Sequence, residues 1–179
     1  LDCGGSPAFC LTDHQIAHVY LNRQDDAFVS KVRKEMESLE GVARVFSGKE
    51  RASIGLDHNR AGDLVLLAKE DAWFAYYHWL DDSLAPDFAR CVDVHRKYGY
   101  DPAELFVDPS IPFPTLKAGG KLLAKKLGFR IFMDLLPLDA SLVKGTNGIR
   151  PNDPLDWPVI LGHGIEPSDT PIMATNVHD

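Results

Sequence analysis

The sequence predicts an α/β fold in which a mixed central sheet is flanked by helices. The first observation is the uninterrupted apolar run Leu64 to Ala68, which follows Gly62 and is typical of a strand buried on both faces. The second is the aromatic-rich run at residues 73–79, whose side chains would fall alternately on two faces, which predicts a strand returning beside the first. We therefore expect a central β-hairpin with Leu66 and Trp73 largely buried.

Two shorter β-type runs, at residues 8–12 and 16–21, predict a second hairpin near the N-terminus. Asp13, His14 and Gln15 separate them, and Asp13 and His14 are expected to be turn residues. An adjacent Asp-His pair can also ligate a metal, but no third ligand follows at a defined spacing, so the turn is the favoured interpretation.

The next segment predicts a helix and a strand. Asp25-Asp26 precedes apolar residues at helical spacing, which predicts a capped helix over residues 27–40. Residues 42–46 predict a strand, followed by a polar connection. Met36 of the helix and Val45 of the strand are expected to be largely buried.

The second half of the chain predicts less regular structure. Residues 87–109 are expected to be mostly loop. Residues 115–127 predict a surface helix with Lys117, Lys121 and Lys125 as a solvated row and leucines roughly opposite. Residues 129–136 and 157–161 predict two further short strands.

Composition limits the possible functions. A chain of 179 residues suggests a single α/β domain over 1–179, and a net charge of −7 argues against a nucleic-acid polymer as partner. Cys3, Cys10 and Cys91 lack metal-site spacing and are expected to be free thiols. We find no membrane-spanning run and no signal-peptide pattern, so we expect no membrane partner and a cytoplasmic location. The abrupt ends, at Leu1 and Asp179, suggest a piece of a longer protein.

One candidate metal site is Asp93-Val94-His95. In extended backbone the carboxylate and the imidazole project to the same side, which suits metal ligation or proton transfer. On local pattern alone the favoured alternative is that Asp93 only orients His95, or pairs with Arg96 or Lys97.

A second candidate is the glycine-flanked loop Lys144-Gly145-Thr146-Asn147-Gly148. Glycines let the backbone approach a ligand closely. The loop lacks the spacing of a nucleotide P-loop, and on local pattern alone it is a turn.

A resemblance gives this loop more weight. The segment D-A-S-L-V-K-G-T-N-G-I-R-P-N-D-P-L-D-W-P-V-I-L-G-H-G-I-E-P resembles the closing segment of the alkaline phosphatase superfamily, in its nucleotide pyrophosphatase and phosphodiesterase branch, where a G-[ST]-H-G loop occurs. The order A-H-V-Y-L, helix, G-V-A-R-V-F, A-G-D-L-V-L-L-A is also similar, as is V-D-V-H-R-K-Y-G-Y-D-P-A-E-L-F. The resemblance implies an alkaline phosphatase-like fold, of which this chain is the C-terminal portion.

The resemblance also implies a chemistry. Members of the family use divalent metals, usually zinc, and a Ser or Thr nucleophile that lies in the N-terminal half, outside this chain. Asn147 stands at the position of the family's metal-binding His, which puts zinc binding there in doubt, since an amide oxygen suits Mg²⁺ or Ca²⁺ better. Lys144 and Thr146 are expected to bind substrate, and Asp93 and His95 remain metal candidates.

Two functions follow as expectations. The first is a metal-dependent hydrolase of phosphodiester or phosphomonoester bonds acting on a small phosphate ester or nucleotide, with this chain as its C-terminal part. The second is a binding or structural domain that kept the fold and lost the metal and the nucleophile. Because no Ser or Thr stands in a recognisably activated setting, we expect the isolated chain to be inactive.

Overall fold

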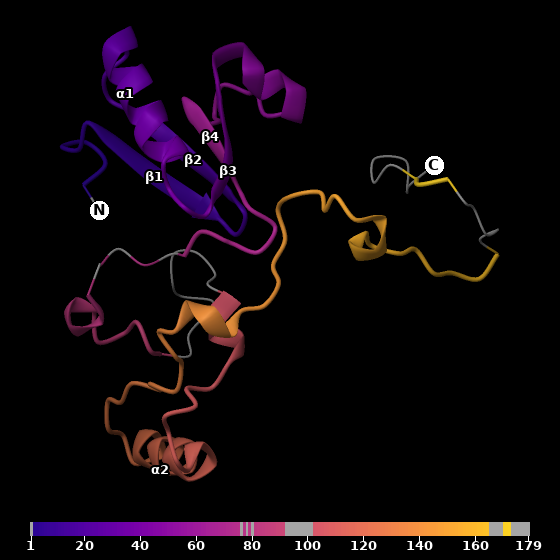
Figure 1. The fold of residues 1–179 in the computed structure, drawn as a ribbon. Helices are drawn as coiled ribbons and strands as arrows, with labels where there is room; N and C mark the ends of the chain where they lie inside the picture. Colours follow the sequence, from indigo (N-terminus) through magenta and orange to yellow (C-terminus); the bar gives the residue numbers. More distant parts are fainter. Residues whose placement is uncertain are drawn as a thin grey trace. The chain divides into compact units, whose positions relative to one another are not determined.

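The computed structural model describes residues 2–75, 77, 79, 81–91, 102–164 and 170–172. The chain divides into two units, Leu1–Ile149 and Arg150–Asp179 (Figure 1). The first unit holds a four-stranded sheet and two α-helices, so the expected α/β class is confirmed.

The sheet is antiparallel in all three of its strand pairs. Its strands are β1 (Ala8–Asp13), β2 (Ile16–Leu21), β3 (Val42–Ser47) and β4 (Leu64–Ala68), in the order β1-β2-β4-β3. The run predicted as the buried centre is β4, where Leu64 and Val65 have no exposed surface and Leu66 is 2% exposed. The strands expected at 8–12, 16–21 and 42–46 are confirmed to within one residue at each end.

The partner predicted for β4 is wrong. Its two neighbours are β2 and β3, and the described residues between 71 and 79 form no strand. Both edges of β4 are occupied, and Phe74 instead donates its N–H to the His14 carbonyl at 2.7 Å, at the end of the N-terminal hairpin. Trp73 is only half-buried, while Tyr77 and Trp79 stack on each other at 5.0 Å between ring centroids.

Helix α1 (Asp26–Glu37) connects β2 to β3, which are parallel to each other because each is antiparallel to β4. Asp25 caps the helix as predicted, since its side chain accepts the Phe28 N–H at 2.9 Å. The helix packs its apolar side on one face of the sheet, and Met36 is half-buried there. The buried residues of this core are Ala17, Val19, Leu21, Val32, Val42, Val45, Leu64 and Leu66.

The chain enters β4 through Gly62, which lies against the backbone of β2. A Cβ at this position would lie 2.7 Å from the Val19 nitrogen and 2.8 Å from the Leu64 carbonyl oxygen, so no side chain fits. The Gly62 N–H donates to His18 Nδ1 at 3.1 Å. His18 therefore joins the sheet to the connection before β4, in the structural role that its position in a strand suggests.

The remainder of the first unit is mostly irregular, apart from α2 (Pro114–Lys126) and short 3₁₀ turns. The strand expected at 129–136 is reduced to one isolated bridge, Cys91 to Asp134. The expected lysine row is only partly solvated, because Lys117 and Lys121 bind Asp134. In the described part of the chain, the 3₁₀ turns are Gly48–Ile54, Asp82–Leu84, Pro102–Leu105, Ala140–Leu142 and Pro154–Asp156.

In the second unit, the described part of the expected strand at 157–161 is irregular chain. Trp157 holds its segment locally, since its Nε1–H donates to the Pro151 carbonyl at 2.8 Å and its ring lies 4.2 Å from the Arg150 guanidinium carbon. Throughout the described ranges we find no helix long and apolar enough to cross a bilayer. Cys3, Cys10 and Cys91 form no disulfide within the described residues, which agrees with the expectation that they are thiols.

Candidate functional site

The glycine-flanked loop at residues 144–148 lies against the turn of the N-terminal hairpin. The Gln15 N–H donates to the Asn147 carbonyl at 3.2 Å. His14 Nδ1 lies 2.5 Å from the Thr146 hydroxyl oxygen, a hydrogen bond between residues 132 positions apart. Two segments singled out separately in the sequence therefore meet, and we take this contact as the candidate site.

The turn itself is fixed by Gln15. Asp13 pairs with Ile16, so the two-residue turn consists of His14 and Gln15, and His14 adopts φ 54°. The turn position predicted for His14 is confirmed, whereas Asp13 is the last residue of β1. Gln15 is 5% exposed, and its Nε2 donates to three backbone carbonyl oxygens in the segment just after β4, at 3.1 to 3.4 Å. Those carbonyls belong to Lys69, Glu70 and Ala72. The hairpin end is thus held from behind by the chain that leaves β4.

Gly148 lets the loop approach this turn. Its φ is 129°, in a region that residues other than glycine rarely adopt. A Cβ here would lie 3.1 Å from both Cβ and N of Gln15. The glycine is needed for contact between two backbones, which explains its presence without any ligand.

At this contact an acid, an imidazole and a hydroxyl follow one another in space. His14 Nε2 is 3.9 Å from Asp13 Oδ1, and the other ring nitrogen meets Thr146. An imidazole beside a hydroxyl can take up its proton. Asp13, however, is 81% exposed and lies beyond hydrogen-bond distance, so it orients the ring weakly. Thr146 therefore contacts a potential base that lies 132 positions away, and no local pattern indicates this partner.

The predicted site residues divide into two groups. Thr146 is half-buried at the contact, whereas the side chains of Lys144 and Asn147 are exposed. Asp93 and His95 lie outside the described residues, so their position relative to the loop is not established. The structure adds His14 and Gln15 to the site; the adjacent Asp-His pair was the only sequence signal for either.

A metal centre is not formed by the described residues alone. Among them, no group of three or more His, Cys, Asp or Glu side chains is arranged to hold an ion. Asn147 can contribute an amide oxygen, which suits Mg²⁺ or Ca²⁺ better than Zn²⁺. A zinc site with several ligands would need side chains from outside the described residues, and Asp93 and His95 are the ones predicted from the sequence.

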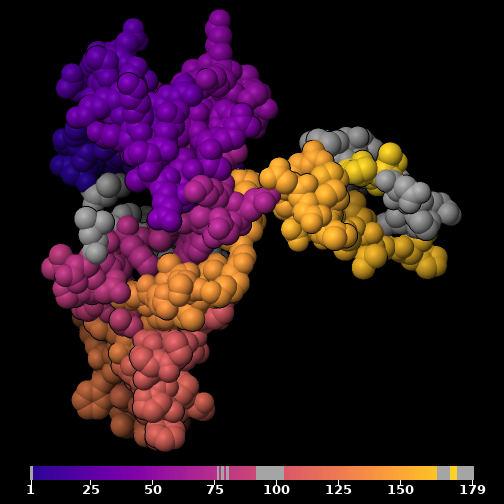
Figure 2. Space-filling model, viewed as in Figure 1, coloured from indigo at the N-terminus to yellow at the C-terminus, as the bar shows by residue number. Residues whose placement is uncertain are grey.

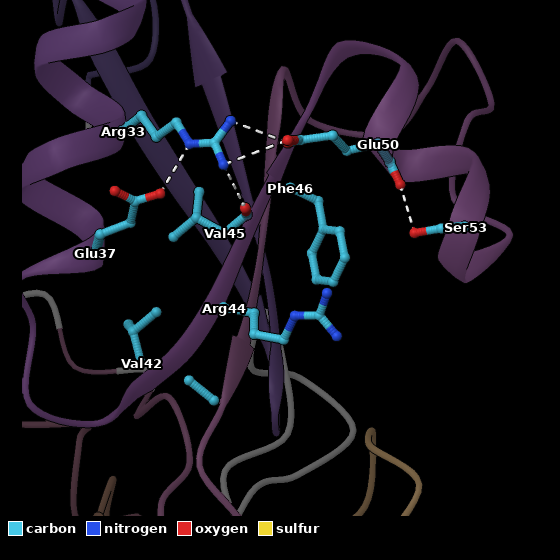
Figure 3. A pocket seen from close by; sticks show the side chains of 9 residues that line it. Arg33, Glu37, Val42, Arg44, Val45, Phe46, Glu50 and Ser53 are labelled. Atoms are coloured by element: carbon cyan, nitrogen blue, oxygen red, sulfur yellow. Dashed lines mark hydrogen bonds and ion pairs between the residues drawn. The ribbon is translucent and has the colours of Figure 1, made fainter.

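A pocket of about 540 Å³ lies beside β3 (Figure 3). Arg33 reaches across it from α1, donating to Glu37, Ser47 and Glu50 at 2.8 to 2.9 Å and to the Val45 carbonyl at 3.3 Å. These bonds raise the pKa of the Arg33 guanidinium above its usual value and use its donors. The pocket is therefore the place where Arg33 ties α1 to β3 and to the following 3₁₀ turn.

No family model, curated protein or solved structure matches the chain. The family resemblance consequently rests on the sequence segments quoted above, and its implications for chemistry are proposals.

Proposed function

We propose that this chain is the C-terminal part of a metal-dependent hydrolase of phosphodiester or phosphomonoester bonds, similar to the nucleotide pyrophosphatase and phosphodiesterase branch of the alkaline phosphatase superfamily. The supporting observation is that loop 144–148 is attached to the hairpin turn through Thr146 and Asn147, while the side chains of Lys144 and Asn147 stay exposed. A loop with a fixed backbone and open polar side chains is suited to hold a small anionic substrate in one orientation.

Each residue of the loop has a role in this proposal. The Lys144 ammonium pairs with phosphate oxygens, as lysines do in many phosphate sites. The Thr146 hydroxyl can accept a hydrogen bond from His14 while it donates one to the substrate. The Asn147 amide oxygen, with Asp93 and His95, would hold a divalent ion. When bound, such an ion stabilises negative charge on the phosphate.

A non-catalytic binding domain is the second candidate. Two observations favour it: an amide stands where the family has an imidazole, and the described residues alone provide no three-ligand group. In this case the loop still binds a phosphate ester, but no bond is cleaved. The two candidates therefore share a binding site and differ in metal affinity and turnover.

Binding of inorganic phosphate to the purified chain tests the shared site. We expect Lys144→Gln to weaken phosphate binding by about tenfold, because one direct charge-assisted contact is lost. Lys126→Gln is the matched control, since this exposed lysine lies on α2, outside the loop. Equal effects of the two substitutions, or no measurable phosphate binding, would contradict the proposed site.

Zinc binding by variants of the predicted ligands, measured beside hydrolysis of bis(p-nitrophenyl) phosphate, then separates the two candidates. We expect well below one zinc ion per isolated chain and hydrolysis equal to a blank with the same metal, because the proposed nucleophile belongs to another part of the enzyme. Asn147→His is expected to raise zinc affinity without creating activity. Tightly held zinc with activity abolished by His95→Ala would instead show a working site within this chain. If zinc affinity did not change when Asp93, His95 or Asn147 was substituted, the result would contradict the hydrolase proposal.

A further inference from the structure

Helix α2 is attached to its unit by its lysine side and turns its leucine side outward. Lys117 Nζ lies 2.8 Å from the Asp134 carbonyl oxygen, and Lys121 Nζ lies 2.7 Å from the Phe132 carbonyl oxygen. These two lysine side chains are 34% and 25% exposed. The leucines on the other side are Leu116, Leu123 and Leu127, which are 75%, 59% and 68% exposed. Surface helices normally show the opposite arrangement.

The outward side is a continuous stripe with a gap in it. Leu116, Gly120, Leu123 and Leu127 are spaced by four, three and four residues, which places them on one face of a helix. A Cβ at Gly120 would meet no atom within 4 Å. Gly120 therefore leaves a notch between exposed leucines, into which a side chain of another helix can fit. In the view of Figure 2 the α2 segment (salmon) lies at the surface.

The spacing of this stripe is the same read in either direction. If a second α2 packs antiparallel, Leu116 of each copy meets Leu127 of the other, and Leu123 of each copy meets the Gly120 notch of the other. A two-fold dimer requires such a self-complementary surface, because the same residues must serve on both sides. The pattern does not require an unrelated partner.

Charge also favours a second copy over a lipid surface. Asp134 binds Lys117 and Lys121, which reduces repulsion between two α2 helices. A helix lying in a membrane interface needs its lysines free to reach lipid phosphates at the edge of the apolar side. Here two of the four lysines of α2 are bound within the chain and lie away from the leucines.

We propose that the leucine stripe of α2 is a dimerisation surface on which a second copy of this chain packs its own α2 in the antiparallel direction. Burial of six leucines, three from each copy, supplies the driving force. One short helix pair makes a small interface, so the dimer is expected to dissociate in the micromolar range. The inference is independent of the proposed hydrolase activity.

Sedimentation equilibrium of the whole chain across the micromolar range tests the proposal. We expect a monomer–dimer equilibrium whose dissociation constant rises more than about tenfold in Leu123→Gln and in Gly120→Leu. The Cβ that Gly120→Leu adds meets no atom within 4 Å, and leucine favours the helix, so loss of the dimer with unchanged circular dichroism cannot be attributed to unfolding. Leu122→Gln is the matched control: it is 57% exposed on the same helix but lies off the stripe, and its dimer should persist.

Three outcomes would overturn the proposal. One is a monomer at every concentration. Another is a dimer that neither Leu123→Gln nor Gly120→Leu weakens. The third is a monomer that sediments with phosphatidylserine vesicles in a manner that depends on Leu123, which would assign the stripe to a lipid surface.

Discussion

The sheet region and the α2 region use similar apolar side chains in opposite ways. In β4, Leu64, Val65 and Leu66 are at most 2% exposed, whereas α2 buries none of its residues. Large apolar side chains are also exposed on the segments that flank α2 in the sequence. Among them are Phe113, Phe129 and Phe132. Both regions have regular backbone, so regular structure and a buried core are separate outcomes here.

The difference has a local cause. In the sheet, β4 has a hydrogen-bonded neighbour on each side, and α1 packs on the face to which Leu64 and Leu66 contribute, so the neighbouring strands and the helix together enclose these side chains. In α2, helical spacing creates a leucine side and a lysine side, but Asp134 binds the lysines and so turns the leucines outward. Helical periodicity predicts that a face exists. The partner of the opposite face decides which way it points.

Exposed apolar surface of this kind usually marks a contact with something else. For α2 the stripe fits a second copy, as argued above. We therefore expect substitutions in β4 to lower the free energy of unfolding, and equivalent substitutions in α2 to weaken the association of two copies of the chain.

The largest expected effect is a loss of stability from a substitution in the sheet region. Leu66→Ala removes a side chain that is 2% exposed and should lower the free energy of unfolding by about 2–5 kcal/mol, since a cavity remains. Leu123→Ala removes the same atoms from an exposed site and should change it by less than about 0.5 kcal/mol at concentrations where the chain is monomeric. Urea denaturation measures both. Equal losses would show that α2 has a buried core and would end the comparison.

The sequence predicts most of the sheet region because its signals are local. Asp25 caps a helix, and strands such as Ile16–Leu21 show apolar patterns of the right length. The pairing of β4 depends on strands distant in sequence, and the alternating aromatics at 73–79 imitate a strand without forming one in the described residues. Local pattern therefore predicted which segments are strands better than it predicted their partners.

The same limit applies to the candidate site. Glycines mark loop 144–148 as a place of close approach, and Gly148 is indeed packed on Gln15. The partner of Thr146 is His14, 132 positions away, and no periodicity connects positions so far apart. Asp93 and His95 were chosen from their spacing alone, and they stay a prediction.

Two glycine substitutions, one in each region, are expected to change stability by intermediate amounts and in opposite directions. Gly62→Ala places a Cβ 2.7 Å from the Val19 backbone nitrogen and should cost about 1–3 kcal/mol, because the sheet backbone must shift. Gly120→Ala meets nothing within 4 Å and should stabilise the monomer by about 0.5–1 kcal/mol through helix propensity. Thermal unfolding of both variants gives the signs. Destabilisation by Gly120→Ala would mean that the notch is already filled by the chain itself.

The smallest expected effect is a pH dependence that belongs to the sheet region. Burial lowers the pKa of His18 from its usual 6.5, and nearby Arg51 lowers it further, while Asp13 acts in the opposite direction. The neutral ring is also required by geometry, because Nδ1 accepts the Gly62 N–H. As the pH falls below about 6.5, the unfolded chain takes up a proton before the folded chain does, so stability decreases until the pH passes below the lowered pKa.

Substitution of His18 by Asn isolates this contribution. The Asn side-chain oxygen can accept the same Gly62 N–H but does not titrate, so His18→Asn should retain stability near neutral pH and lose less than the natural chain on acidification. The measurement is the urea midpoint of both proteins at about pH 7.5 and about pH 5, above the range in which most carboxylates titrate. If both midpoints fall equally, protonation of His18 does not weaken the sheet. A smaller fall in the variant would show that the close approach of Gly62 to β2 depends on a neutral imidazole.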